Sequence, residues 1–253
     1  MIKVDLTFAE NNSSRYISAS PFPHIVIDNF MIDKYLDQAL RVFPSPSQVK
    51  WTEYDNPLEK KLMNSNIEEY EEPISKIINF MNSDEFLKFL EKLTRNEGLI
   101  ADTDLIGGGL HQIQRGGKLD IHADFNVHYK TKNIRCLNAI LFLNKDWREE
   151  YGGHLELWDK EMTECKQKIL PIFNRLVIFN TNETSYHGHP EVLNCPDNFT
   201  RKSIALYYYL KNTEDKKGRS TKYMKRPSDP IDENLDKFRA LRSIPKDKRN
   251  NNE

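Results

Sequence analysis

The chain has 253 residues and a mass of 29.8 kDa, a size typical of one domain that buries its own core without disulfide or metal staples. Hydrophobic residues make up 38% and charged residues 30%, and apolar runs such as 139–143 fall far short of the roughly 20 residues of a membrane helix, which excludes a membrane protein. The net charge of −1 conceals a basic C-terminal segment, because residues 211–253 hold 13 Lys+Arg against 8 Asp+Glu.

The N-terminal region is predicted to begin with a short strand and a helix. Residues 25–27 are all β-branched and follow the break at 21–23, which predicts a strand. Residues 31–43 repeat apolar side chains at helical spacing, and the Pro-Ser run at 44–47 ends that helix.

Two further helices are predicted before residue 100. Residues 67–81 have helical periodicity, and Pro73 inside this stretch predicts that the helix begins or bends there. Ser83 is the predicted N-cap of a third helix, because acidic residues fill the first turn and a broad apolar face follows. Gly98 is predicted to close it.

From about residue 100 to Leu210 the pattern changes to short runs of β-branched and aromatic residues separated by glycines and other turn signals. Several short strands without helices between them predict a β-sandwich or barrel. The predicted strands cover residues 105–106, 110–114, 119–123, 136–143, 154–158, 168–172, 175–179 and 203–210.

The segment after Leu210 is polar. Residues 234–241 predict one more helix, and residues 246–253 are expected to be disordered. For this basic segment a solvated and partly disordered appendage is favoured over contact with nucleic acid or an acidic partner. The chain is therefore divided into an N-terminal strand with supporting helices (1–100) that belong to the same domain as a β core (101–212), and a basic polar tail (213–253).

The three cysteines and the N-terminus bear on the compartment. An odd number of cysteines without close spacing does not indicate a disulfide framework or a zinc site. Residues 1–14 lack the basic and then apolar pattern of a secretory signal. A cytoplasmic protein in a reducing compartment is therefore expected.

His122 and Asp124 are the first candidate ligand pair. On a strand, residues i and i+2 point to the same face, so both side chains can bind one ion. The pattern alone is weak, because chance gives about 0.5 His-x-Asp pairs in a chain of this composition. A surface His beside a turn-forming Asp is the alternative explanation.

A third ligand would strengthen this pair, and His187 lies 63 residues after Asp124. His187 follows the apolar strand 176–179, and in a small barrel a later strand can return beside the first. Two His and one carboxylate leave three positions of the metal open, which suits a non-haem Fe(II) oxygenase. His189 is the alternative ligand because it shares a face with His187. His187 is favoured, because Pro190 constrains His189 to an extended, rim-like position.

Arg201 opens the apolar strand 201–209 and shares one face of it with Ser203. An Arg that points into a barrel needs an anionic partner, because a buried unpaired charge is costly. Its guanidinium binds a carboxylate in two parallel hydrogen bonds, and the Ser203 hydroxyl can add another donor. For this strand taken alone, a surface ion pair is the alternative.

The order His-x-Asp, distal His and Arg on the last strand resembles the Fe(II)- and 2-oxoglutarate-dependent dioxygenases. The likeness is closest to their prolyl 4-hydroxylase-like branch, which includes oxygen-sensing enzymes and small microbial and viral members. The resemblance is specific over 105–210, looser upstream and absent in the tail. The segments that carry it are 21–30, 135–147, 152–157 and 175–179.

The resemblance implies a mainly β fold with N-terminal helices and a double-stranded β-helix core of the jelly-roll, cupin-like type. It implies that His122, Asp124 and His187 are the catalytic ligands of Fe(II). It also implies that Arg201 binds the distal carboxylate of the cosubstrate, 2-oxoglutarate.

One position departs from the oxygen-sensing members. These often carry a cosubstrate-binding Tyr where this chain has Phe142. Ser203 or a Tyr of the last strand is then expected to replace that hydrogen bond. Gln112 falls where the same enzymes place another polar contact to 2-oxoglutarate.

The implied function is hydroxylation of a prolyl residue in a protein or peptide. The reaction would consume O2 and 2-oxoglutarate, release succinate and CO2, and use ascorbate as an accessory reductant. Arg135 and Asn138 are the candidate substrate contacts. Two alternatives stay open: hydroxylation of a free amino acid, a glycan or another small metabolite, and a barrel-shaped binding module without turnover. Neither a nucleic-acid nor a membrane partner is expected.

Overall fold

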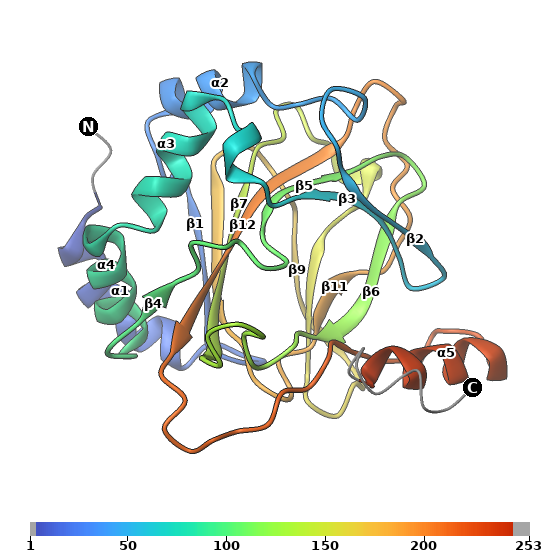
Figure 1. The fold of residues 1–253 in the computed structure, drawn as a ribbon. Coiled ribbons are helices and arrows are strands. Elements are labelled where there is room, and N and C mark those ends of the chain that lie inside the picture. The colour runs from blue at the N-terminus through green and yellow to red at the C-terminus, as the bar shows by residue number, and fades with distance from the viewer. Residues whose placement is uncertain (1–3, 245–253) are drawn as a thin grey trace.

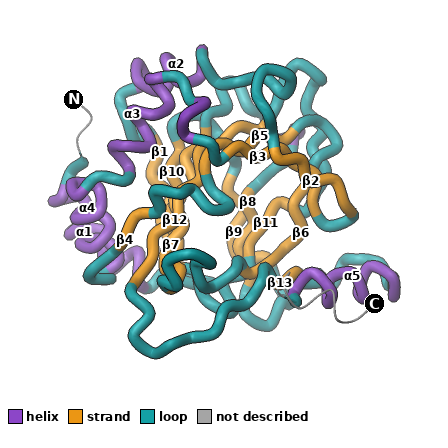
Figure 2. Tube along the Cα trace, in the orientation of Figure 1, coloured by secondary structure: helices purple, strands orange, loops and turns teal. Residues whose placement is uncertain are grey.

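Residues 4–244 are described by the computed structural model, in which a curled antiparallel sheet carries the N-terminal helices along one side and the C-terminal helix at the opposite side (Figures 1 and 2). This confirms the predicted mainly β fold with N-terminal helices. The helices are α1 (Leu6–Ile17), α2 (Asp33–Arg41), α3 (Glu72–Met81), α4 (Asp84–Thr94) and α5 (Glu233–Ser243), with 3-10 turns at Ile67–Glu69 and Glu149–Tyr151. The strands are β1 (His24–Asp28), β2 (Thr52–Asn56), β3 (Glu59–Asn64), β4 (Ile100–Ala101), β5 (Gly109–Ile113), β6 (Lys118–Ala123), β7 (Ile134–Phe142), β8 (Leu155–Trp158), β9 (Cys165–Ile169), β10 (Arg175–Asn180), β11 (His187–His189), β12 (Arg201–Leu210) and β13 (Lys222–Tyr223).

The sheet is continuous and antiparallel. Its strand order is β1-β10-β7-β12-β5-β3-β6-β11-β8-β9, with β13 beside β6, β2 beside β3 and β4 beside β12. The order brings β6, from the first half of the core, next to β11, which lies more than sixty residues later. The sheet curls so that its inner face encloses the region into which the predicted ligand residues point.

The side chains of strand β12 alternate between the two faces of the sheet. Ile204, Leu206 and Tyr208 belong to the large apolar core beneath the N-terminal helices. The alternate residues, which include Arg201 and Ser203, face the inside of the curl, as the period of two predicts. Burying a large apolar side chain contributes about 1.5–3 kcal/mol, so the outer face of β12 fixes the direction in which Arg201 points.

The N-terminal helices largely match their predicted positions. Helix α3 begins at Glu72, one residue before Pro73, and the Ser83 hydroxyl accepts the Phe86 N–H at the start of α4. The predicted stop at Gly98 is wrong by a few residues. Helix α4 ends at Thr94 because Arg95 adopts a left-handed conformation with φ of 56°.

Several elements differ from their predictions. The predicted strand at 105–106 is absent from the described chain, and the strand predicted at 168–172 lies earlier, at Cys165–Ile169. Helix α1 and the hairpin of β2 and β3 were not predicted. The hairpin has a polar sequence. Its strand β3 pairs with β5 and β6, and β2 pairs with β3, so the hairpin forms by strand pairing rather than by an apolar pattern of its own.

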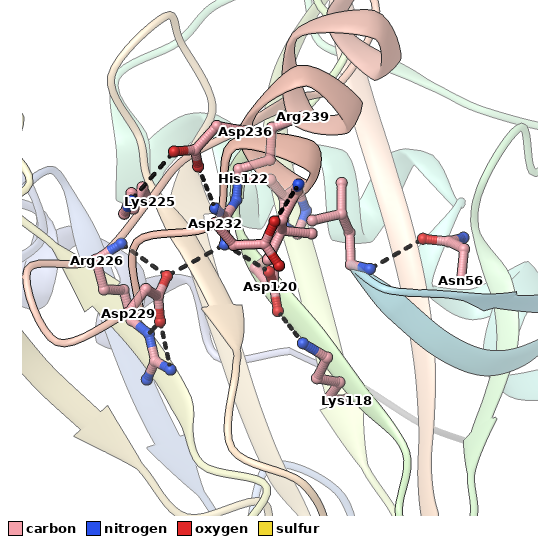
Figure 3. Close-up of polar contacts among 12 residues, drawn as sticks. Asn56, Lys118, Asp120, His122, Lys225, Arg226, Asp229, Asp232, Asp236 and Arg239 are labelled. Atoms are coloured by element: carbon pink, nitrogen blue, oxygen red, sulfur yellow. Dashed lines mark hydrogen bonds and ion pairs between the residues drawn. The ribbon is translucent and has the colours of Figure 1, made fainter.

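The C-terminal segment is not a solvated appendage over its described part. Its predicted helix is observed as α5, and β13 pairs with β6. Arg239 of α5 is buried and contacts Asp120, which also binds Lys118 (Figure 3). The predicted disorder of 246–253 lies outside the described residues. Among residues 4–244, no helix has the length and apolar content that crossing a membrane requires.

Candidate metal centre

His122 and His187 stand directly opposite each other on the neighbouring antiparallel strands β6 and β11. Residues paired in this way have Cβ atoms only about 5 Å apart, and the two imidazole rings lie 4.5 Å apart between centroids. Strand pairing alone therefore brings together two side chains that are 65 positions apart in the printed sequence.

Gly188 permits this close pairing. A Cβ atom at this position would meet the backbone oxygens of Leu119 and Asp120 at 2.8 Å each, which real side chains do not tolerate. The pairing of β11 with β6 also changes register between His187 and His189. Such irregularities are frequent beside functional sites because they re-aim side chains.

Backbone carbonyls fix the orientation of both imidazoles. Nδ1 of His122 lies 2.9 Å from the Asp120 oxygen, and Nδ1 of His187 lies 2.9 Å from the Ser185 oxygen. When Nδ1 carries the proton and donates it to the carbonyl, Nε2 keeps the lone pair that a metal ion needs. Burial lowers the pKa of His122, which favours the same neutral form.

Asp124 completes the cluster one residue beyond the end of β6. Its Oδ1 lies 3.3 Å from Nε2 of His122, and its Oδ2 lies 3.3 Å from Nε2 of His187. The ligand atoms of these three residues lie within 4.8 Å of one another. This is the one group of three or more potential metal ligands within residues 4–244, and it has the predicted His187 rather than the alternative His189.

Arg135 and Asn138, the predicted substrate contacts, both bind Asp124. Nη2 of Arg135 and Nδ2 of Asn138 each lie 3.0 Å from Asp124 Oδ2, and Arg135 also binds the Asn138 amide oxygen. Burial raises the pKa of Asp124, but the charge of Arg135 and the two histidines outweigh it, so this pKa lies well below its usual range. Asp124 is thereby kept as an anion.

An open cavity of about 250 Å³ adjoins this cluster. Asp124, Phe125 and Arg135 line it together with polar residues of the segment 180–183. The Arg135 guanidinium lies over the rings of Phe125 and Tyr207, at 4.7 and 3.4 Å from their centroids. Asn138 is buried behind Arg135 and is not part of this lining.

Arg201 lies on the inner face of the sheet and is only 5% exposed. Its Nε donates to the Gly153 oxygen at 2.8 Å, and its guanidinium lies 4.9 Å from the centroid of the Phe142 ring. Arg201 forms no ion pair with a carboxylate of residues 4–244. Burial lowers the pKa of Arg201 to about 9. Ser203 shares this face and pairs across the sheet with Phe142.

Gln112, by contrast, lies on the other face of the sheet. It pairs with Lys202 on β12, and its amide donates to the Pro44 oxygen at 2.8 Å, away from Arg201. The structure therefore does not bring Gln112 together with the predicted cosubstrate contacts. The neighbouring His111 pairs with Ser203 and occupies the inner face instead. The sequence held no signal for this choice, because it depends on the register between β5 and β12.

Iron and 2-oxoglutarate fit these residues. Two imidazole nitrogens and one carboxylate on one side of a metal ion form the donor set of non-haem Fe(II) oxygenases. A buried guanidinium without a carboxylate partner in the described chain matches an anionic ligand, since an isolated buried charge is costly. His122, Asp124 and His187 would hold the metal, and Arg201 would bind the carboxylate.

The comparison with family models confirms the resemblance predicted from the sequence. The model of the 2OG-Fe(II) oxygenase superfamily matches residues 108–209, which include the three candidate ligands and Arg201. A mouse (Mus musculus) prolyl 3-hydroxylase is 34% identical over 79 residues. That match spans 30% of this chain and 14% of the mouse protein.

Solved structures share the fold at low sequence identity. A Trichoplax adhaerens prolyl hydroxylase, solved with a hypoxia inducible factor peptide, has a TM-score of 0.58 at 17% identity and covers 81% of this chain and 90% of its own. A Pseudomonas putida prolyl-4-hydroxylase has a TM-score of 0.54 at 15% identity, with 80% and 98% covered. HygX from Streptomyces hygroscopicus, solved with nickel, 2-oxoglutarate and hygromycin B, has a TM-score of 0.51 at 11% identity, with 74% and 82% covered. These likenesses confirm the predicted double-stranded β-helix core.

Proposed function

We propose that this chain, whose residues 108–209 match the 2OG-Fe(II) oxygenase superfamily, hydroxylates a prolyl residue of a protein or peptide. The observation that carries the proposal is the buried cluster of His122, Asp124 and His187 inside a curled sheet that also buries the unpaired Arg201. In the overall reaction, O2, 2-oxoglutarate and a C–H bond yield an alcohol, succinate and CO2. One oxygen atom of O2 enters succinate and the other enters the alcohol.

The protein residues prepare the site for this reaction. His122 and His187 present Nε2 because backbone carbonyls hold their Nδ1 protons. Arg135 and Asn138 hold Asp124 in place as an anion. Bound Fe(II) supplies the activation of dioxygen. Arg201 orients the cosubstrate through its distal carboxylate, and the apolar side chains of Phe142 and Ala205 exclude water from the interior.

The substrate is proposed to approach through the open cavity beside Asp124. Phe125, Arg135, Asn182 and Glu183 are among the residues that line this cavity. Amide and carboxylate groups of the lining can pair with the backbone of an extended peptide. Similarity of part of the chain to a prolyl 3-hydroxylase supports a prolyl side chain as the target.

The proposal is tested by measuring succinate formation from 2-oxoglutarate with Fe(II) and ascorbate under air. The wild type is compared with His122→Ala, with and without proline-containing peptides, and His154→Leu serves as the matched control because His154 binds Glu149 near the surface. We expect turnover that peptides raise, that is lost in His122→Ala and that persists in His154→Leu. Mass spectrometry of the peptide should then find one added oxygen atom on proline.

Three other outcomes would contradict parts of the proposal. If no peptide raises turnover, the protein is still an oxygenase, but its substrate is a free amino acid, a glycan or another small metabolite rather than a prolyl residue. Equal succinate formation by the wild type and His122→Ala would contradict the assignment of His122 as a metal ligand. Binding of iron and 2-oxoglutarate without succinate from any substrate would favour a barrel that binds without turnover.

A further inference from the structure

His189, on strand β11, is buried without a hydrogen-bond partner in the described part of the chain. Its side chain is 3% exposed, and both ring nitrogens lack a partner among residues 4–244. An unpaired buried polar atom costs about 1–3 kcal/mol, so native structures seldom retain one without a ligand, a water molecule or a functional role. The metal cluster does not account for His189, because the ligand set is completed by His187.

The surroundings of His189 indicate the chemistry of the missing partner. The positive charges of Arg201 and Lys61 lie close enough to His189 to interact with it. An imidazole carries at least one N–H donor in either protonation state. Such a donor beside a buried guanidinium suits an anion, since the guanidinium supplies the charge and the imidazole adds a hydrogen bond.

The other basic groups of this region already have partners. Lys61 lies 3.2 Å from a carboxylate oxygen of Glu59, and Nε2 of His111 lies 3.1 Å from the Gly107 oxygen. His189 is thus the group near Arg201 whose hydrogen-bonding capacity is unused within the described residues. A carboxylate accepts hydrogen bonds at about four positions, and a bidentate Arg takes two of them.

We propose that His189 donates a hydrogen bond to the distal carboxylate of 2-oxoglutarate, beside Arg201. This inference rests on the proposed function, because it needs 2-oxoglutarate as the cosubstrate. Phe142 has no hydrogen-bond donor for this carboxylate, and the Gln112 amide donates to the Pro44 oxygen on the other face of the sheet. His189 is then a cosubstrate-contacting residue rather than a ligand of the metal.

The test is the affinity of the metal-loaded protein for 2-oxoglutarate, measured without turnover. The full chain is loaded with Mn(II), and 2-oxoglutarate is titrated by calorimetry into the wild type, His189→Leu, His189→Gln, Arg201→Leu and the control His154→Leu. The second probe is 2-oxovalerate, which has the same five-carbon chain and keto acid but no distal carboxylate. The affinity for Mn(II) is measured separately for each variant.

We expect His189→Leu to weaken 2-oxoglutarate binding about tenfold, the effect of one lost hydrogen bond of about 1.4 kcal/mol. His189→Gln, which keeps a donor, should recover part of this loss. Affinities for Mn(II) and 2-oxovalerate should stay unchanged, because neither involves the distal carboxylate. His154→Leu should match the wild type for both ligands.

The inference is overturned on its own if Arg201→Leu weakens 2-oxoglutarate binding but His189→Leu does not. It is also overturned if His189→Leu weakens both keto acids equally or lowers Mn(II) affinity, because His189 would then support the fold or the metal. A wild type that binds Mn(II) but not 2-oxoglutarate would overturn the proposed function, and this inference with it.

Discussion

Arg239 of helix α5 contacts the carboxylate of Asp120 at 3.3 Å, and the backbone oxygen of the same Asp120 faces Nδ1 of His122 at 2.9 Å (Figure 3). Arg239 also binds Asp229 and Asp236, so the C-terminal segment is connected through Asp120 to the first metal-site histidine. The C-terminal segment, which is polar in sequence, therefore supports the His122 imidazole through Asp120.

Replacing Arg239 should weaken metal binding without removing a ligand. Arg239→Leu leaves the Asp120 carboxylate with Lys118 alone and loosens strand β6 where it orients His122. Substitutions behind a metal ligand typically cost 10- to 100-fold in affinity; since Arg239 acts through one more residue, about 3- to 10-fold is expected. Mn(II) titration measures this, with the exposed Lys237→Ala as control. Equal Mn(II) affinities for the wild type and Arg239→Leu would contradict the role of Arg239 in supporting the metal site.

Gly188→Ala should separate the two histidines. The added Cβ would lie 2.8 Å from two backbone oxygens of β6, so β11 must move away from His122. We expect a loss of at least tenfold in Mn(II) affinity and a destabilisation of about 1–3 kcal/mol, as for other overpacked sites. Gly218→Ala is the matched control, because its nearest contact would be an ordinary 3.8 Å. Comparable metal affinity in both variants would contradict the close-packing argument.

Removing the charge of Arg201 should stabilise the metal-free protein while it abolishes cosubstrate binding. An unpaired buried cation is costly, and an apolar side chain of similar length avoids that cost. For Arg201→Met we expect a free energy of unfolding about 1 kcal/mol above the wild type, measured by urea denaturation in EDTA. A less stable variant would mean that Arg201 is held by partners within the protein.

The metal-free protein should lose stability as the pH falls below about 6.5. Burial lowers the pKa of His24, and burial together with nearby charges lowers that of His111 to about 3. Between about pH 3 and 6.5 the unfolded chain binds a proton at His111 that the folded chain does not, so stability rises with pH by up to about 1.4 kcal/mol per unit from this group. Urea denaturation from pH 5 to 7.5 measures the slope. His111→Asn should reduce it, and an unchanged slope would contradict the assignment.

The sequence predicts those parts of the site that depend on local pattern. The strand period predicts that His122 and Asp124 lie together, although β6 ends at Ala123, and the apolar alternation of β12 predicts that Arg201 points inward. The isolation of His189 and the inward position of His111 depend on a register change in β11 and on the pairing of β5 with β12. A one-residue shift in pairing would turn either side chain to the other face, and no local pattern specifies that register.

The contacts of Asp120 and the β2–β3 hairpin were beyond prediction for a different reason. The hairpin carries few apolar residues, and it joins the sheet through β3, which pairs with β5 and β6. The contact between Arg239 and Asp120 joins residues 119 positions apart, and polar residues at that separation carry no periodic signal. The sequence shows that the C-terminal segment is basic, but it does not predict that this segment packs against β6.

Strand β13 pairs Tyr223 with His122, and Arg242 binds Glu59 beside the same tyrosine. The strand that carries the first metal ligand therefore pairs with β3, which precedes it in the chain, and with β11 and β13, which follow it. Closing loops of this length costs entropy before the new contacts stabilise the structure, and folds dominated by such pairings form slowly. We expect β6 to be a late element of folding. During synthesis it would expose an unpaired edge until residues 222–223 leave the ribosome, so that interval is the time at which the nascent chain is most open to misassociation.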